Sequence, residues 1–297
     1  MNTIIEHQND QIVLDRLSAQ RNLYSAAKRW RNLRFLLCVL TIVVLSVIRA
    51  FFVDDQTIAI ILGLAVFVSL LLGPVFNKQI SRKRTLAARI QQLMETELFE
   101  LPWEENLCGP QPIAEDVYNH KSSIIPDDLH NWYTVNIGKV QDHNTAVLLC
   151  QRENLKYDSH IRTSFTRMCL WFGIIACVAI AVVSFFLYKD DTLSIIMFGL
   201  IPITPIVRWI QSVLNEDGRD KSYRDALEAL VKTEMENALK GKPVRVNVLK
   251  QIQNHMFQHR KEGYLVPDCY HNICRKQSEE RAAYSVLDFL ARYKAEQ

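Results

Sequence analysis

The stretch LRFLLCVLTIVVLSVIRAFFV, residues 33–53, contains only two charged side chains, Arg34 and Arg49. A bilayer core about 30 Å thick is crossed by roughly 20 apolar helical residues, so this stretch is long enough to span it. Three further stretches have a similar length and composition: TIAIILGLAVFVSLLLGPVF (57–76), MCLWFGIIACVAIAVVSFFLY (168–188) and TLSIIMFGLIPITPIVRWI (192–210). Helices buried in soluble proteins rarely run so long without charge. The sequence therefore predicts an all-α membrane protein with four transmembrane helices.

Short acidic connections join the four spans in pairs. Asp54 and Asp55 lie between the first two spans and residues 189–191 (KDD) between the last two, so each pair forms a tight antiparallel hairpin. Basic residues flank the opposite ends: Lys28, Arg29, Arg31, Arg34, Lys78, Arg82, Lys83, Arg84 and Arg89 beside the first hairpin, and Arg162, Arg167, Arg208, Arg219 and Lys221 beside the second. Because basic loops stay in the cytoplasm, both termini and the middle of the chain are expected there.

Helical periodicity continues outside the spans. Apolar residues recur at helical spacing around Leu17, Leu93, Leu230 and Leu287, and such stripes need packing partners, which predicts a cytoplasmic helical bundle. Four prolines mark an irregular linker. The expected order is an N-terminal cytoplasmic helix (1–32), the first hairpin (33–76), a cytoplasmic helix (77–100), the linker (101–127), a segment leading into the third span (128–167), the second hairpin (168–210) and a C-terminal helical region (211–297).

The two halves of the chain resemble each other. QRNLYSAAKRWR from Gln20 is similar to QRENLKYDSHIR from Gln151, and LMETEL from Leu93 is similar to LVKTEM from Leu230. Such similarity is typical of an internal repeat. Both copies leave the cytoplasm and return, so the hairpins form a parallel repeat, unlike the inverted repeats of many ion-coupled carriers.

Charge is nearly absent within the spans. No Asp or Glu lies at mid-depth, where a proton or cation site normally needs a carboxylate. Arg49 lies about one turn from the outer end of the first span, close to Asp54 and Asp55. Two interpretations are open: a snorkelling or ion-paired side chain, and an outer ring that favours anions in a pore.

Small residues recur at one-turn spacing in two spans. They are Ser69 and Gly73 in the second span, and Gly173, Cys177 and Ala181 in the third. Such stripes let helices approach closely, either within one chain or between chains. We expect the stripe in the third span to support self-association into a homo-oligomer.

Three prolines lie near the inner ends of spans: Pro74 in the second, and Pro202 and Pro205 in the fourth. Proline bends or ends a helix because it lacks the amide hydrogen. Each position is therefore either a gate hinge or a helix terminus.

No catalytic motif is present. The chain lacks GxxxxGK[ST], GxGxxG, HExxH and GxSxG, so we expect neither an enzyme nor a cofactor. The net charge of +3 gives no indication of DNA or RNA binding, and seven cysteines without a CxxC pair argue against a disulfide framework. Metal-ligand residue types do gather near the C-terminus, at His255, His259, Cys269, His271 and Cys274. Their spacing matches no strong zinc pattern, so surface or packed positions are favoured and no metal is predicted.

The segment 129–162 combines aromatic and basic side chains on the approach to the third span. Its members are Trp132, Tyr133, Arg152, Asn154, Tyr157 and Arg162. Aromatic faces can stack a base and arginine can bind phosphate, which suits a nucleotide ligand. The same residues also suit a membrane-interface belt, where Trp and Tyr anchor helices and Arg meets lipid phosphate.

Four further stretches carry a family resemblance: AQRNLYSAAKR from Ala19, LHNWY from Leu129, CQRENLKYDSHIR from Cys150 and VPDCYHNICR from Val266. Through them the chain resembles, over almost its whole length, the bacterial four-transmembrane effector family that is associated with SMODS nucleotidyltransferases. The resemblance implies a pore-forming effector of CBASS-like, nucleotide-activated antiphage defence. It also implies activation by a cyclic oligonucleotide made by a neighbouring nucleotidyltransferase, and no ligand residues follow from it.

Taken together, we expect a multi-pass protein of the bacterial inner membrane that contacts the lipid bilayer, oligomerises and breaches the membrane when a cytoplasmic signal arrives. A constitutive channel or transporter is one alternative. A membrane scaffold or sensor that acts through a partner protein is another.

Overall fold

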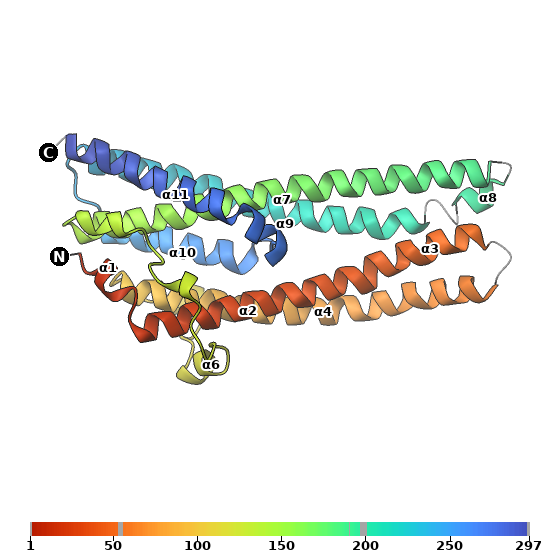
Figure 1. Ribbon diagram of the computed structural model, residues 1–297, viewed down its shortest axis with the longest axis horizontal. Coiled ribbons are helices and arrows are strands. Elements are labelled where there is room, and N and C mark those ends of the chain that lie inside the picture. The colour runs from red at the N-terminus through yellow and green to blue at the C-terminus, as the bar shows by residue number, and fades with distance from the viewer. Residues whose placement is uncertain (1, 53–55, 190, 197–200, 296–297) are drawn as a thin grey trace. The chain divides into compact units, whose positions relative to one another are not determined.

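The computed structural model describes residues 2–52, 56–189, 191–196 and 201–295, and within these ranges it contains helices and no strand (Figure 1). The helices and their bounds are α1 (Ile4–His7), α2 (Gln11–Phe35), η1 (Leu36–Leu40), α3 (Thr41–Phe51), α4 (Gln56–Leu98), α5 (Glu105–Cys108), α6 (Ala114–Tyr118), η2 (Asp127–Leu129), η3 (Val135–Lys139), α7 (His143–Leu187), α8 (Thr192–Ile195), α9 (Ile201–Leu239), α10 (Val246–Glu262) and α11 (Asp268–Ala295). The predicted all-α class is confirmed.

Three of these helices are long and apolar enough to cross a membrane. The first runs from Gln11 to Arg49, where α2 continues through the π-helical turn η1 into α3. The second is α4, and the third is the part of α7 up to Phe186. Most of each of the first three predicted spans (33–53, 57–76 and 168–188) lies in them. The fourth predicted span falls on α8 and the start of α9, with residues 197–200 outside the described part of the chain. The acidic residues Asp54, Asp55 and Asp190, predicted to form the outer turns, also lie outside it.

The chain divides into two compact units. Unit 1 contains residues 1–26, 82–162 and 218–297, and unit 2 contains residues 27–81 and 163–217. The helices α2, α4, α7 and α9 each run past a boundary and contribute to both units.

Unit 2 contains the predicted spans and exposes apolar side chains. In α4, Ile60 is 70% exposed and Leu64 is 60% exposed, and no residue of its most apolar 18-residue window is buried. A helix in water would bury such a face, because about 25 cal/mol is gained per Å² of apolar surface removed from water. This exposed apolar surface is therefore suited to contact with the acyl chains of lipids.

Aromatic contacts join the helices of unit 2, both within each hairpin and, through Phe35 and Trp209 at 5.0 Å, between α2 and α9. The rings of Trp30 and Phe76 lie 5.8 Å apart between α2 and α4, where Arg34 Nη1 also donates to Asn77 Oδ1 at 2.6 Å. Between α7 and α9, Phe172 and Trp209 meet edge to face at 6.4 Å. Two helical hairpins therefore follow each other along the chain, in agreement with the predicted fold.

Unit 1 is a helical bundle with one large core. The start of α7, the end of α9, and the helices α10 and α11 contribute most of its buried side chains, among them Val147, Leu148, Leu149, Leu227, Val231, Leu249, Ile252, Val286 and Phe289. The apolar stripes predicted around Leu17, Leu93 and Leu230 pack within this unit. The stripe predicted around Leu287 is wrong in register, because α11 buries Val286 and Phe289 and leaves Leu287 45% exposed. The proline-containing segment 101–127 carries the short helices α5 and α6 and ends at the start of η2.

An ion cluster at Asp128 fixes the end of this segment. Arg21 of α2 donates to Asp128 Oδ1 at 2.7 Å, and Arg275 of α11 bonds the other carboxylate oxygen. The hydrogen bond from Arg21, together with Arg275, lowers the pKa of Asp128 to about 2. The N-terminal and C-terminal helices are thus joined through η2.

Candidate functional site

Two side chains of the predicted ligand segment meet inside unit 1. Tyr133 is fully buried, and its ring packs against Phe99 with centroids 5.6 Å apart. Its hydroxyl lies 3.4 Å from Glu95 Oε1, to which Asn154 Nδ2 also donates at 3.1 Å. Burial raises the pKa of Tyr133 well above its usual value, so the phenol stays protonated and donates.

The other members of the segment contact different elements. Arg152 donates to Ser285 Oγ of α11 and to the sulfur of Met235 in α9, and burial lowers its pKa. Arg162 donates to the backbone oxygen of Tyr264. Trp132 packs partly buried against the core, and Tyr157 is partly buried in α7. The structure therefore brings Tyr133 and Asn154 together and keeps Arg152 and Arg162 apart.

Glu95 is the centre of a buried polar network that sequence reasoning missed. Its carboxylate is fully buried, and Arg260 of α10 binds it with two hydrogen bonds of 2.5 and 2.8 Å. Gln253 Nε2 adds a donor at 2.6 Å, and Gln91 Nε2 adds one at 3.2 Å. Burial alone would lower the pKa of Arg260, but Glu95 more than compensates and the pKa stays above its ordinary value. The two side chains therefore satisfy each other's hydrogen-bonding groups, as buried charged groups require.

This network joins α10 to the helices that lead into the membrane. Gln253 also donates to Gln92 of α4 and accepts from Gln151 of α7, which donates in addition to the Leu249 carbonyl. Near the end of α10, Arg84 of α4 donates to the Gly263 carbonyl at 2.9 Å. In the sequence, this network is indicated only by polar residues that interrupt the apolar stripes. Charged residues at such positions are seldom fully buried unless they pair with another polar group.

Glu153 is a second carboxylate with a perturbed environment. It lies in α7 about four turns before the predicted third span and accepts a hydrogen bond from the Thr134 amide at 3.2 Å. Burial raises the pKa of Glu153 to about 7. Its charge state therefore changes near neutral pH.

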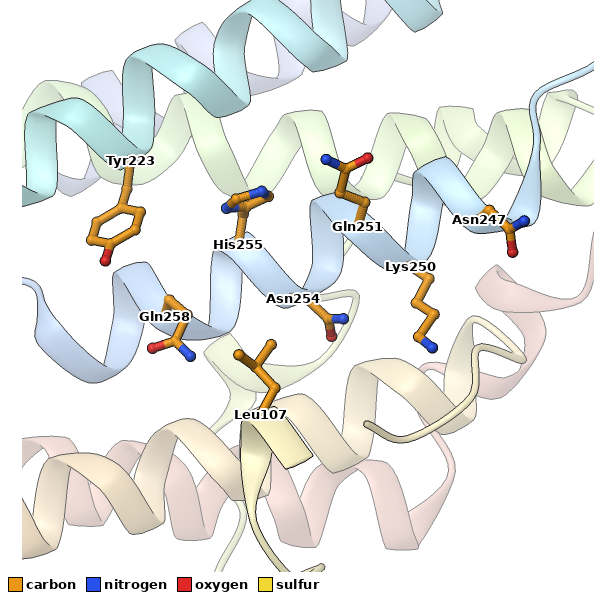
Figure 2. A pocket seen from close by; sticks show the side chains of 8 residues that line it. All are labelled: Leu107, Tyr223, Asn247, Lys250, Gln251, Asn254, His255 and Gln258. Atoms are coloured by element: carbon orange, nitrogen blue, oxygen red, sulfur yellow. The ribbon is translucent and has the colours of Figure 1, made fainter. Parts of the chain in front are cut away.

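The opposite face of α10 lines an open groove (Figure 2). The groove has a volume of about 670 Å³, within the range of small-molecule sites. Its lining consists of Asn247, Lys250, Gln251, Asn254, His255 and Gln258 of α10, together with Leu107 of α5 and Tyr223 of α9. In Figure 2, Gln251 and His255 project from one edge of α10, and Lys250, Asn254 and Gln258 project from the edge that faces Leu107.

Four carboxamides dominate this groove. Asn247, Gln251, Asn254 and Gln258 follow spacings of four, three and four residues, which places them on one side of a helix. None of their side chains forms a hydrogen bond to a residue within the described ranges. Gln253, on the inner face of the same helix, is by contrast fully engaged with Glu95, Gln92 and Gln151. The groove therefore offers unused donors and acceptors to a ligand.

Most of the membrane candidates lie in α3, α4 and α7. Arg49 donates to the Phe52 carbonyl, Ser69 Oγ donates to the Val66 carbonyl at 2.7 Å, and nothing lies within 4 Å of a side chain built on Gly73. Pro74 lies inside α4 and does not end the helix. Pro202 and Pro205 fall in the first turns of α9, and their side chains lie outside the described part.

The small residues of the third span are not equivalent. Gly173 is buried, and a Cβ atom placed there would lie 2.2 Å from Ile210 Cδ1 of α9. Cys177 is partly buried and Ala181 is exposed. Gly173 therefore serves close packing within one chain, while Ala181 remains accessible to lipid or to another chain.

No three His, Cys, Asp or Glu side chains come together to hold a metal ion within the described ranges. His255 lines the groove, His259 is buried and Cys269 is exposed. The side chain of His271 lies outside the described part.

One protein family matches nearly the whole chain. Its profile, described as the SMODS-associating 4TM effector domain, covers residues 2–289. No curated protein and no solved structure shows significant similarity to the chain.

Proposed function

Because the chain belongs to the family of SMODS-associating 4TM effector domains, we propose that it is a pore-forming effector of bacterial antiphage defence. The observation that carries this proposal is the exposed apolar surface of the membrane-length helices, which continue directly into a packed helical unit. A multi-pass membrane protein with such a unit can link a signal to the state of its spans. The chain offers no catalytic motif that would support an enzyme instead.

We propose that the protein lies in the bacterial inner membrane, with both termini and unit 1 on the cytoplasmic side. The basic residues that flank the spans support it. Two hairpins of one chain supply few helices to enclose water, so we propose that several chains assemble around the pore. Ala181, which is exposed on the third span, would allow a neighbouring chain to approach closely in that assembly.

The trigger that we propose is a cyclic oligonucleotide made by a neighbouring nucleotidyltransferase. The association with SMODS proteins in the family description supports this choice. Binding can open the pore only if the messenger has a higher affinity for the open state than for the closed state. Its site must therefore touch an element that moves between the two states.

Co-expression with the neighbouring nucleotidyltransferase tests the proposal. We expect a membrane-potential dye to report depolarisation when the synthase is active, and no depolarisation with a catalytically inactive synthase. Depolarisation without any synthase would support the constitutive channel instead. An unchanged membrane potential in every strain, with the protein present in the membrane fraction, would contradict pore formation and favour the scaffold.

A further inference from the structure

We propose that the groove on the outer face of α10 binds the nucleobase of a nucleotide ligand. This inference rests on the proposed function for the identity of the messenger, but the chemistry comes from the groove. Four carboxamides face it without hydrogen-bond partners in the described ranges, and each offers a donor and an acceptor side by side. Adenine presents the complementary pair on its Hoogsteen edge, and Asn and Gln are the side chains that read it.

The flanks of the groove suit a flat ring. Tyr223 stands on the α9 side of α10 and Leu107 on the α5 side, so a base in the groove can stack on the aromatic ring or rest against the aliphatic side chain (Figure 2). Stacking on an aromatic side chain is a general means of holding bases. Lys250 supplies a positive charge for phosphate, although it is paired with Glu104 in the structure. The carboxamides therefore contribute more to recognition than charge does.

The position of α10 gives such a ligand a route to the spans. The outer face of the helix lines the groove, and the inner face holds Glu95 of α4 through Gln253 and Arg260. The helix is also bonded to α7 through Gln151. Both α4 and α7 continue into predicted spans. A shift of α10 upon binding would thus move the contacts that these two helices share.

Binding to the full-length protein in nanodiscs tests the assignment. The probes are cyclic di-AMP, cyclic di-GMP, cyclic di-UMP, AMP and inorganic pyrophosphate, each titrated by calorimetry. We expect at least one cyclic dinucleotide to bind and pyrophosphate to bind far more weakly, because the base is the part that is read. AMP binding as tightly as its cyclic dimer would identify a mononucleotide site and overturn the messenger's role in it.

Single substitutions then locate the site. Gln251→Ala and Asn254→Ala should each weaken binding about tenfold, equivalent to about 1.4 kcal/mol. Tyr223→Leu should do the same and Tyr223→Phe should not, because the stacking face is retained. Gln277→Ala on α11 is the matched control, since Gln277 is also an exposed helical carboxamide and lies outside the groove.

Two results would overturn the groove assignment. One is an unchanged affinity in both carboxamide variants, and the other is the absence of binding by every nucleotide probe. Synthase-dependent depolarisation in the same variants would show whether the proposed function survives that failure. A retained response would then move the trigger to another site or to a partner protein.

Discussion

Replacing Glu95 with glutamine should destabilise unit 1 by about 3–5 kcal/mol. Glu95 is fully buried, and the side chain of its partner Arg260 is only 11% exposed. Removing one member of a buried pair leaves the other charge without compensation, and this costs about that much. Glutamine has nearly the shape of glutamate, so the loss reports charge and hydrogen bonding and not a cavity.

Thermal unfolding of the full-length protein in nanodiscs measures this effect. For a unit of about 150–250 residues, 1 kcal/mol lowers the unfolding temperature by roughly 2–4 °C. The Glu95→Gln variant should therefore unfold about 6–20 °C below the wild type. Glu236→Gln is the matched control, because Glu236 is 55% exposed and pairs with Lys232 at 4.0 Å on the surface of α9. Exposed pairs contribute about 0–1 kcal/mol, so the control should stay close to the wild type.

A second substitution separates charge from general damage. Arg260→Met in the Glu95→Gln background removes the uncompensated charge, and apolar replacement of a buried pair is often neutral. The double variant should therefore recover part of the lost stability. The reasoning fails if Glu95→Gln unfolds at the control's temperature. It also fails if Arg260→Met adds a further full loss, since the two side chains would then act independently.

Three other outcomes are expected. Burial raises the pKa of Glu153 to about 7, so the folded state binds this proton more tightly than the unfolded state, and stability should fall as pH rises from about 4.5 to 7. The Glu153→Gln substitution removes that loss, so it should stabilise the protein by about 3 kcal/mol near pH 8 but little near pH 5. The unfolding temperatures of the wild type and the variant, measured across this pH range, check this; parallel profiles for the two proteins would contradict it. Gly173→Ala should destabilise the protein by about 1–3 kcal/mol through overpacking and so lower its unfolding temperature. Gly73→Ala is the control, because Gly73 has open space around it and the unfolding temperature should not fall. Equal shifts in the two variants would argue against close packing at Gly173. The exposed Cys269 should be alkylated in the native protein. Cys108 is buried and its pKa is raised to about 11, so it should be alkylated only after unfolding. Mass spectrometry measures both rates, and equal rates at the two cysteines would exclude a buried thiol at Cys108.

Sequence alone predicted the helical class and the first three spans, because the length and hydropathy of a span are local properties. Residues such as Ile60 and Leu64 need no partner within the chain to be placed in lipid. The turns at Asp54 and Asp190 and the middle of the fourth span lie outside the described part, so those expectations remain predictions.

The polar centre of unit 1 could not be predicted in the same way. Glu95 and Arg260 are far apart in sequence, and each looks like an ordinary polar position of an amphipathic helix. Only the packing of α4 against α10 decides that these two side chains face each other. For Tyr133, the residue type suggested a ligand site, because aromatic side chains can stack bases. Residue type alone could not show that the Tyr133 hydroxyl would face Glu95 inside the unit.

The difference in binding affinity that one groove can provide between the closed and open states determines how many subunits the proposed effector needs. Reversing a closed-to-open ratio of 99:1 requires an affinity difference of about 10⁴ between the two states. One carboxamide pair and one stacked base, each worth about tenfold, together provide about 10² if they form only in the open state. A single occupied groove would therefore bring such a protein only to about half open. Two grooves acting on one shared pore multiply their differences and reach about 10⁴. Two messenger molecules that each fill one groove of an oligomer would thus open a pore that one messenger leaves half open, and the response should rise more steeply than the first power of messenger concentration. Depolarisation that follows a simple single-site curve would argue against this coupling.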